Sequence, residues 1–493
     1  MASIGFLLVH RQAFPDLISN GFARDPQQCF CPWTASHSQP KRTRLTRRGS
    51  ALLVDAHARA ILTSMDEGVE VRMARAAIVI ILALGCAVAF VWHTLPAATS
   101  ARTDAARETL TPARISASER IRDEIKVVED MLPQLVDHGA ALFLLAHNYA
   151  RLGEQAKALN LLRQCIALDE GFDPAGDKAF SSLQSNPEFL KLMYLVRRRN
   201  PPVRRAQVAF TVAQSDLFPE GLGVDTSKRI FYMGSEYHNK IVRISETGAV
   251  TEFVKEGIYD LMPVGGVHVD PTDHSVWCAT DPGKKNRSEI VHFDAQGKLV
   301  ERYSPSTAGP HDLNDLVLRG TSEIYVTDTE GNHVFRFNRE AHRFTELNLG
   351  RPVLGPNGIT ISDDGDVLYV GDNLGVIRMD LRTRQAQDLN PAAHDTMAGV
   401  DGLYWHERSL VGVEYGTGAY RVMLWKLSPD GREVISSETL ERGTEMVRDP
   451  TTGAILDGKF YFMANTGIEN LDSGKMADPM KLQPLQIAVL PLK

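Results

Sequence analysis

Several features that would assign a function directly are scarce or missing in this 493-residue chain. Its five cysteines stand at positions 29, 31, 86, 165 and 278, without the even spacing of a disulfide framework, and the first two do not have the spacing of a zinc ligand pair. No Gly-x-Ser-x-Gly motif occurs, which argues against a serine hydrolase. The net charge of −7 and the pI near 6.1 favour no basic face, so a nucleic-acid partner is not expected.

Long uncharged apolar runs are also scarce, and the one that decides topology extends from Ala76 to Trp92, directly after Arg72 and Arg75. Its length is typical of a transmembrane anchor or a signal peptide, so residues 73–98 are assigned to one of the two. The positive-inside rule then places everything after this segment on the extracytoplasmic, periplasmic side, anchored in the membrane or secreted. Residues 1–72 lack any period and predict a disordered tail, or an over-extended gene start, since a chain beginning at Met73 would carry an ordinary signal peptide.

Residues 116–200 show a helical period. Apolar residues recur at three and four along 141–152, Gly153 ends that helix, and a second helix follows from Ala156. The small and large residues of this hairpin look like one tetratricopeptide (TPR) repeat, although any amphipathic helical hairpin would give a similar pattern. We therefore expect a small helical module that contacts its neighbour or another protein. The segment from Arg197 to Arg205 contains two prolines and predicts a linker.

Beyond Arg205 the period becomes two, in pairs of short strands separated by turns. The first apolar residues of the opening strands lie 45, 49, 43, 44 and 43 residues apart, at Leu222, Val267, Leu316, Ile359, Leu403 and Met446. Six units of this length predict a six-bladed β-propeller over residues 205–493, which a β-sandwich would not imitate. The last unit ends after its third strand, so the stretch 207–211 is expected to supply the fourth and close the ring. The fold class is thus mostly β, with an N-terminal helical, TPR-like module.

A propeller brings the starts of its innermost strands together around one end of a central channel. The residues two positions before each opening strand are Glu220, Gly265, Asn314, Asn357, Asp401 and Thr444. Four of the six offer amide or carboxylate oxygens and none is His or Cys, so the pattern favours a hard divalent cation, Ca²⁺ before Zn²⁺. Each residue alone is also an ordinary turn residue. The prediction depends on the fact that all four stand at the same position of the repeat. The predicted metal ligands are Glu220, Asn314, Asn357 and Asp401.

These motifs carry a family resemblance over residues 205–493. Phe218-Pro219-Glu220-Gly221, Leu313-Asn314-Asp315, Gly355-Pro356-Asn357-Gly358 and Val400-Asp401-Gly402 together resemble the gluconolactonase, regucalcin and senescence-marker family, and more distantly the paraoxonases. The resemblance implies a divalent cation on Glu220, Asn357 and Asp401, with Asn314 contacting the substrate or the metal, and hydrolysis of lactones or related esters. Members related to gluconolactonase usually carry arginine where this chain has Asp312, a departure that argues against a sugar-acid lactone.

The expected chemistry is hydrolysis in which a cation polarises the ester carbonyl and a carboxylate or imidazole takes a proton from water. Asp401 is the first candidate base, and His268 and His311 are further candidates because each lies close to a predicted rim position. Two alternatives remain open at this point. One is a non-catalytic, membrane-tethered propeller that binds a partner, and the other is a propeller related to strictosidine synthase, which lacks the metal.

Overall fold

The computed structural model describes residues 116–492 except 419, 473, 477 and 479–481. The chain divides into two units, Met1–Pro112 and Ala113–Lys493, and the predictions for residues 1–72 and 73–98 lie outside the described residues. Within the described residues, no helix has both the length and the apolar character required to cross a membrane.

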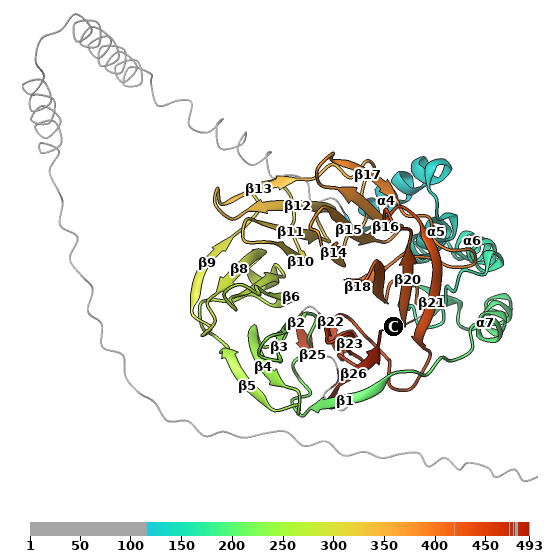
Figure 1. Cartoon of the computed structure of the whole chain (residues 1–493). Coiled ribbons are helices and arrows are strands. Elements are labelled where there is room, and N and C mark those ends of the chain that lie inside the picture. Colours follow the sequence, from blue (N-terminus) through green and yellow to red (C-terminus); the bar gives the residue numbers. More distant parts are fainter. Residues whose placement is uncertain (1–115, 419, 473, 477, 479–481, 493) are drawn as a thin grey trace, which may run out of the picture. The chain divides into compact units, whose positions relative to one another are not determined.

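Residues 207–491 form six four-stranded antiparallel sheets around a central channel, as the repeat predicts (Figure 1). Within blades 1 to 5 the strands run in chain order from the channel outward. Blade 1 consists of β2 Leu222–Asp225, β3 Ile230–Ser235, β4 Lys240–Ser245 and β5 Val250–Val254. Blade 2 consists of β6 Val264–Val269, β7 Val276–Thr280, β8 Glu289–Phe293 and β9 Leu299–Tyr303, and blade 3 of β10 Leu313–Arg319, β11 Glu323–Asp328, β12 His333–Asn338 and β13 Arg343–Glu346. Blade 4 consists of β14 Ile359–Ile361, β15 Val367–Asp372, β16 Gly375–Asp380 and β17 Gln385–Asp388, and blade 5 of β18 Val400–His406, β19 Ser409–Glu414, β20 Arg421–Leu427 and β21 Val434–Arg442.

Blade 6 closes the ring with strands from both ends of the propeller. Its order is β22 Gly453–Leu456, β23 Lys459–Met463, β26 Leu485–Pro491 and β1 Gln207–Val212. The outermost strand β1 pairs antiparallel with β26, with Gln207 opposite Val489 and Val212 opposite Leu485. This pairing confirms the predicted closure of the ring by strands from both ends of the propeller.

The start of blade 6 was predicted wrongly from the sequence. Its opening strand begins at Gly453, so the first apolar residue is Ala454 and not Met446. The chain first makes an irregular excursion over residues 443–452, in which Met446 packs against the edge of an apolar cluster without joining a strand. The residue at the rim position is therefore Thr452, whose hydroxyl donates to the carbonyl of Glu220, and not Thr444.

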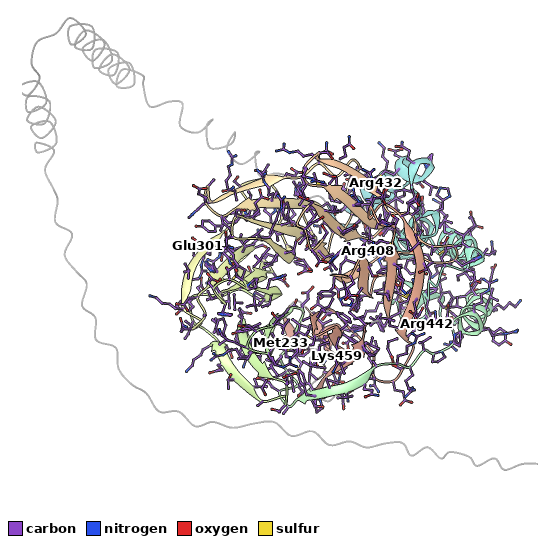
Figure 2. The ribbon with its side chains drawn as sticks, viewed as in Figure 1. Met233, Glu301, Arg408, Arg432, Arg442 and Lys459 are labelled. Carbon is purple, nitrogen blue, oxygen red and sulfur yellow. The ribbon has the colours of Figure 1, made fainter. Side chains whose placement is uncertain are left out.

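The blades hold together through apolar clusters shared between neighbours. Trp277 of β7 is fully buried with Leu316 and Phe335 of the next blade. Because successive side chains of a strand point to opposite faces of the sheet, such residues lie between neighbouring sheets. Side chains fill these spaces throughout (Figure 2): Met233 is fully buried within blade 1, whereas Lys459 at the start of β23 is exposed. This packing holds the inner strands, and hence the rim, in fixed positions.

The helical module comprises α4 Ala117–Met131, η1 Leu132–Gln134, α5 His138–Arg151, α6 Gln155–Leu168, η2 Lys178–Leu183 and α7 Pro187–Arg199. Ser116 begins α4 with a reciprocal capping box to Glu119, and Asp137 caps α5 by accepting from the amide of Ala140. The helix pair α5 and α6 packs through Ala146, Ala158 and Leu162. A helical hairpin is present as expected, and its assignment as a TPR repeat remains a prediction.

The module packs on the propeller through two apolar clusters. One contains Ala398, from the loop before β18, and the other contains Leu354 and Leu374, from loops of blade 4. These loops lie at the end of the propeller where the opening strands start. The module therefore covers part of the face that carries the predicted rim residues.

Candidate metal centre

Three of the six opening strands are irregular at the point where they reach the rim. The antiparallel register shifts between Val264 and Val267 in β6, between Leu313 and Leu316 in β10, and between Val400 and Gly402 in β18. A β-bulge of this kind adds a residue to one strand and redirects its side chain. The second and third bulges contain Asn314 and Asp401. The first consists of Gly265 and Gly266, against which the backbone of blade 3 packs closely: a Cβ at Gly266 would lie 2.7 Å from the carbonyl oxygen of Asn314.

Glu220 and Asn314 are brought together across the channel mouth. The side-chain amide of Asn314 donates to Oε1 of Glu220 at 2.9 Å, and Asn314 is 7% exposed. Hydroxyls of Thr451 and Thr452 donate to the Glu220 carbonyl. Glu220 is thus fixed through both its backbone and its side chain, by residues from blades 3 and 6.

Asn357 and Asp401 form the second pair. Nδ2 of Asn357 donates to Oδ1 of Asp401 at 2.7 Å, while the buried Oδ1 of Asn357 has no hydrogen-bond partner. The Asn357 backbone is held by Thr327, whose hydroxyl donates to its carbonyl at 2.8 Å. An unsatisfied buried carbonyl oxygen is costly unless a ligand completes it.

The glycines that follow two of these residues have a packing reason. A Cβ at Gly221 would lie 2.1 Å from the carbonyl oxygen of Gly265, and one at Gly358 would lie 2.8 Å from that of Asp401. The inner strands of adjacent blades touch at these positions, so no larger residue fits. The Glu-Gly and Asn-Gly pairs in the sequence therefore reflect close approach of neighbouring blades at the rim.

The structure adds acidic residues that the sequence did not single out as site residues. Glu236 and Asp281 directly follow the second strands of blades 1 and 2, and their carboxylates lie with that of Glu220 in a group whose ligand atoms are within 4.8 Å of one another. Asp312 precedes β10, and its buried Oδ1 has no hydrogen-bond partner. Comparing the residues that follow the second strand of each blade would have found Glu236 and Asp281 in the sequence. With Asp315 and Asp401 these residues are called the carboxylate cluster: Glu220, Glu236, Asp281, Asp312, Asp315 and Asp401.

Burial and neighbouring negative charge raise the pKa of five members of this cluster. Burial, followed by the negative charge of Glu220, raises the pKa of Glu236, Asp281 and Asp401 well above the usual carboxyl range. Burial likewise raises the pKa of Asp312 and Asp315 to about 7, with Glu220 adding to the effect. Like charges this close cannot all ionise without compensation, so the cluster holds either protons or a cation near neutral pH.

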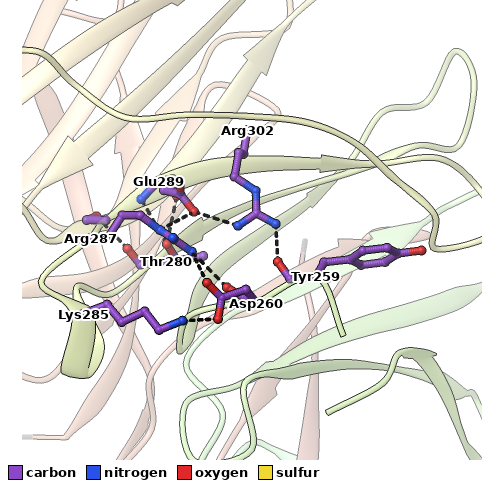
Figure 3. A network of polar contacts seen from close by, with 8 residues as sticks. Tyr259, Asp260, Thr280, Lys285, Arg287, Glu289 and Arg302 are labelled. Carbon is purple, nitrogen blue, oxygen red and sulfur yellow. Dashed lines mark hydrogen bonds and ion pairs between the residues drawn. The ribbon is translucent and has the colours of Figure 1, made fainter. Parts of the chain in front are cut away.

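Basic side chains near the cluster are engaged elsewhere. In blade 2, Arg287 and Arg302 pair with Glu289 at 3.1 and 3.3 Å, and Lys285 pairs with Asp260 (Figure 3). None of the ion pairs between described residues involves a member of the cluster. The network instead fixes β8 next to Thr280, whose hydroxyl donates to the carbonyl of Glu289 and which directly precedes Asp281.

The donor set fits a hard divalent cation. Its members offer only carboxylate and amide oxygens, the ligands that Ca²⁺ and Mg²⁺ take, and neither His nor Cys is among them. The free oxygen of Asn357 and the uncompensated charge of the cluster are the two observations that support this fit. Glu220 belongs both to the predicted set and to the group with Glu236 and Asp281, so it is the shared ligand candidate.

The two candidate histidines lie in different surroundings. Nδ1 of His268 is 3.3 Å from the carbonyl oxygen of Leu316, and burial lowers the pKa of its imidazole. It lines a cavity of about 280 Å³ bounded by the inner strands, together with Asp315 and Tyr404. No hydrogen bond joins His268 to Glu220, Asn314, Asn357 or Asp401 in the described structure.

His311 precedes the rim with both ring nitrogens engaged. Nδ1 lies 2.5 Å from Oδ2 of Asp328, and Nε2 lies 3.0 Å from the carbonyl oxygen of Thr307. Although burial opposes protonation, these hydrogen bonds raise the pKa of His311. The same Asp328 accepts from the amide of Asp312 at 2.7 Å, so the geometry of His311 suits holding the backbone at the rim.

Comparison with known proteins leaves the reaction open. No family model matches the chain, and no curated protein does. Similar solved structures include a gluconolactonase from Xanthomonas campestris (15% identity, 58% of this chain and 90% of that chain covered, TM-score 0.42), virginiamycin B lyase from Staphylococcus aureus (16%, 52% and 81%, 0.40) and PQQ-bound aldose sugar dehydrogenase from Streptomyces coelicolor (15%, 59% and 99%, 0.41). The gluconolactonase belongs to the family that the motifs of this chain resemble. Likeness at this level carries no argument about the reaction, which has to be argued from the carboxylate cluster and its surroundings.

Proposed function

We propose that this chain is a metal-dependent hydrolase of lactones or related esters. The observation that carries the proposal is the carboxylate cluster, whose charge no described basic side chain balances, next to the unpartnered Oδ1 of Asn357. Glu220, Asn314, Asn357 and Asp401 would hold the cation, which we expect to be Ca²⁺, and Glu236 and Asp281 would adjoin it. When bound, the cation supplies a Lewis acid that polarises an ester carbonyl and stabilises the oxyanion.

The protein's part in this reaction is to hold oxygen ligands in place and to accept a proton. Asn314 donates to Oε1 of Glu220, and Asn357 donates to Oδ1 of Asp401. Asp401 is buried at 7% exposure and would accept the proton of the attacking water. The engaged nitrogens of His311 and the contact of His268 with Leu316 make both histidines second choices as the base.

Substrate would approach beside the helical module. A cavity of about 210 Å³ lies between the module and blades 5 and 6, lined among others by His147, Lys178, Tyr415 and Glu469. The Tyr415 amide donates to the carbonyl of Gly399, two residues before Asp401. The part of the substrate remote from its carbonyl would occupy this cavity. Asp312 stands where relatives of gluconolactonase usually carry arginine, so lactones and esters that need no contact with that arginine are favoured over sugar-acid lactones.

The proposal includes a location outside the cytoplasm. It is supported by the apolar run from Ala76 to Trp92 and the arginines before it. The segment would anchor the protein in the membrane or be removed on secretion, and N-terminal sequencing of the mature protein would distinguish these outcomes.

A lactone and aryl-ester panel tests the activity. Purified wild type, Asp401→Ala and the exposed-turn control Asp363→Ala would be assayed with and without millimolar Ca²⁺. We expect Ca²⁺-dependent turnover in the wild type and the control, and a loss of at least about a hundredfold in Asp401→Ala. Equal turnover in wild type and Asp401→Ala would remove Asp401 from the mechanism. Absence of both turnover and bound metal would favour a binding propeller or one related to strictosidine synthase.

A further inference from the structure

The loop that delivers Asp401 to the rim is held from both sides. It spans residues 389–399, between β17 and β18. On the propeller side, the Gly399 amide donates to the carbonyl of Asp372 at 2.9 Å, and the Gly399 carbonyl accepts from the amides of Tyr415 and Gly416. These bonds fix the end of the loop two residues before Asp401.

On its other side the loop contacts the helical module. The hydroxyl of Thr396 donates to Oδ2 of Asp137 at 2.6 Å, and Oδ1 of Asp137 accepts from the amide of Ala140 at 2.8 Å. Asp137 and Thr396 are 4% and 0% exposed. One carboxylate thus caps α5 and binds the loop, so the position of the helix is tied directly to that of the loop.

Two further contacts extend along the same loop. Ala398 is buried in the apolar cluster of the module, and Nδ1 of His394 lies 3.3 Å from the carbonyl oxygen of Leu168 at the end of α6. The Ala398 amide donates to the hydroxyl of Thr396 at 3.1 Å. The module therefore touches the loop at its middle and near its end, over residues 394–398.

A buried ionic group lies behind the loop and connects it to the strand beside Asp401. Arg421 pairs with Asp395 at 3.0 Å and with Glu414, and the indole of Trp425 donates to the second oxygen of Asp395 at 2.9 Å. Glu414 lies opposite Val400 in the register of β18 and β19. A displacement of Thr396 would therefore be transmitted to Val400, next to Asp401.

We infer that the helical module is a positioning element for the metal centre, and that it acts on Asp401 through the buried Asp137–Thr396 hydrogen bond. The inference rests on the proposed function in so far as Asp401 is taken to be a metal ligand. The contacts that connect the module to the loop before Asp401 do not depend on that proposal. A module of this kind needs no peptide ligand, because its docked face is already occupied by the propeller.

The test separates positioning of Asp401 from general stability. Thr396→Val keeps the shape of the side chain and removes the hydroxyl, while Thr396→Ser keeps the hydroxyl. Val291→Ala is the matched control, because Val291 is a buried core residue of blade 2 that belongs neither to the loop nor to the two clusters that join the module to the propeller. Ca²⁺ affinity by calorimetry, Tm, and amide exchange over residues 399–402 would be measured on the full chain.

We expect Thr396→Val to weaken Ca²⁺ binding about tenfold, because the loop would hold Asp401 less firmly, and to speed amide exchange over 399–402. Thr396→Ser should restore both, and Val291→Ala should lower Tm while leaving both unchanged. Wild-type affinity and exchange in Thr396→Val would overturn the inference, as would equal effects in Val291→Ala. If wild type binds no Ca²⁺, the proposed function fails, and amide exchange alone decides whether the module positions the loop.

Discussion

Nδ2 of Asn357 donates a 2.7 Å hydrogen bond to Oδ1 of Asp401, while the buried Oδ1 of Asn357 has no partner in the protein. The amide thus orients the carboxylate beside it and directs its own oxygen to the place where a cation would be held. This relationship joins blades 4 and 5 at the rim, and it accounts for asparagine at this position better than turn formation does.

The first prediction concerns that oxygen. Asn357→Leu retains the size of the side chain and removes both the free oxygen and the bond to Asp401. We expect Ca²⁺ affinity to fall by at least about tenfold, measured by calorimetry. Asn348→Leu, at an exposed position of blade 3, should bind Ca²⁺ as the wild type does, and retained affinity in Asn357→Leu would show that this oxygen is no ligand.

The second prediction concerns stability with and without metal. A ligand that binds the folded state alone stabilises it in proportion to the logarithm of its concentration over Kd. Saturating Ca²⁺ should therefore raise the Tm of chelator-treated protein by about 5–10 °C, in a thermal scan at pH 7. An unchanged Tm at millimolar Ca²⁺ would contradict a structural contribution of bound metal.

The third prediction distinguishes charge repulsion from metal binding in the carboxylate cluster. Glu236→Gln and Asp281→Asn each remove one negative charge next to Glu220. Without metal, each variant should be more stable than the wild type near pH 7, with Tm higher by about 2–4 °C, because burial and neighbouring negative charge force the wild-type carboxyl to take up a proton on folding and the amide needs none. With saturating Ca²⁺ this advantage should disappear, since a ligand has been lost. A variant whose Tm and Ca²⁺ affinity both equal those of the wild type would place that carboxylate outside the site.

The fourth prediction is a pH dependence within the helical module. Burial, with the charges of Asp137 and Asp395, raises the pKa of Glu170 from 4.5 to about 7, and its buried Oε2 has no hydrogen-bond partner. The folded state therefore favours the protonated acid, and its stability falls as pH rises from about 4.5 to about 7.

Glu170→Gln should remove this penalty. The gain in Tm over the wild type should be near zero at pH 4.5 and reach about 2–4 °C at pH 8. The exposed control Glu340→Gln should show no such trend in the same series of thermal scans. A constant difference between Glu170→Gln and the wild type across this pH range would mean that Glu170 does not titrate as described.

Much of the rim could be predicted because a propeller repeats. The phase of each unit placed Glu220, Asn314, Asn357 and Asp401 at one end of the channel, and the structure pairs them as Glu220 with Asn314 and Asn357 with Asp401. Glu236 and Asp281 were missed because they lie at the ends of the second strands of their blades. Only the positions before the opening strands were compared between blades in the sequence.

Other features depend on contacts that no local pattern contains. The opening strand of blade 6 is displaced by the excursion over residues 443–452, which breaks the repeat. The hydrogen bond between Asp137 and Thr396 joins residues 259 positions apart. In the sequence the first is only a helix cap and the second only a loop residue, so their meeting follows from tertiary packing alone.

The most direct test of the central claim is the metal content of the purified protein, compared between wild type and Glu220→Gln after exhaustive dialysis. Elemental analysis followed by Ca²⁺ titration should show a divalent cation retained or rebound by the wild type and affinity reduced at least about tenfold in Glu220→Gln. A wild-type protein that carries no divalent metal and shows no binding heat with millimolar Ca²⁺ would contradict the account.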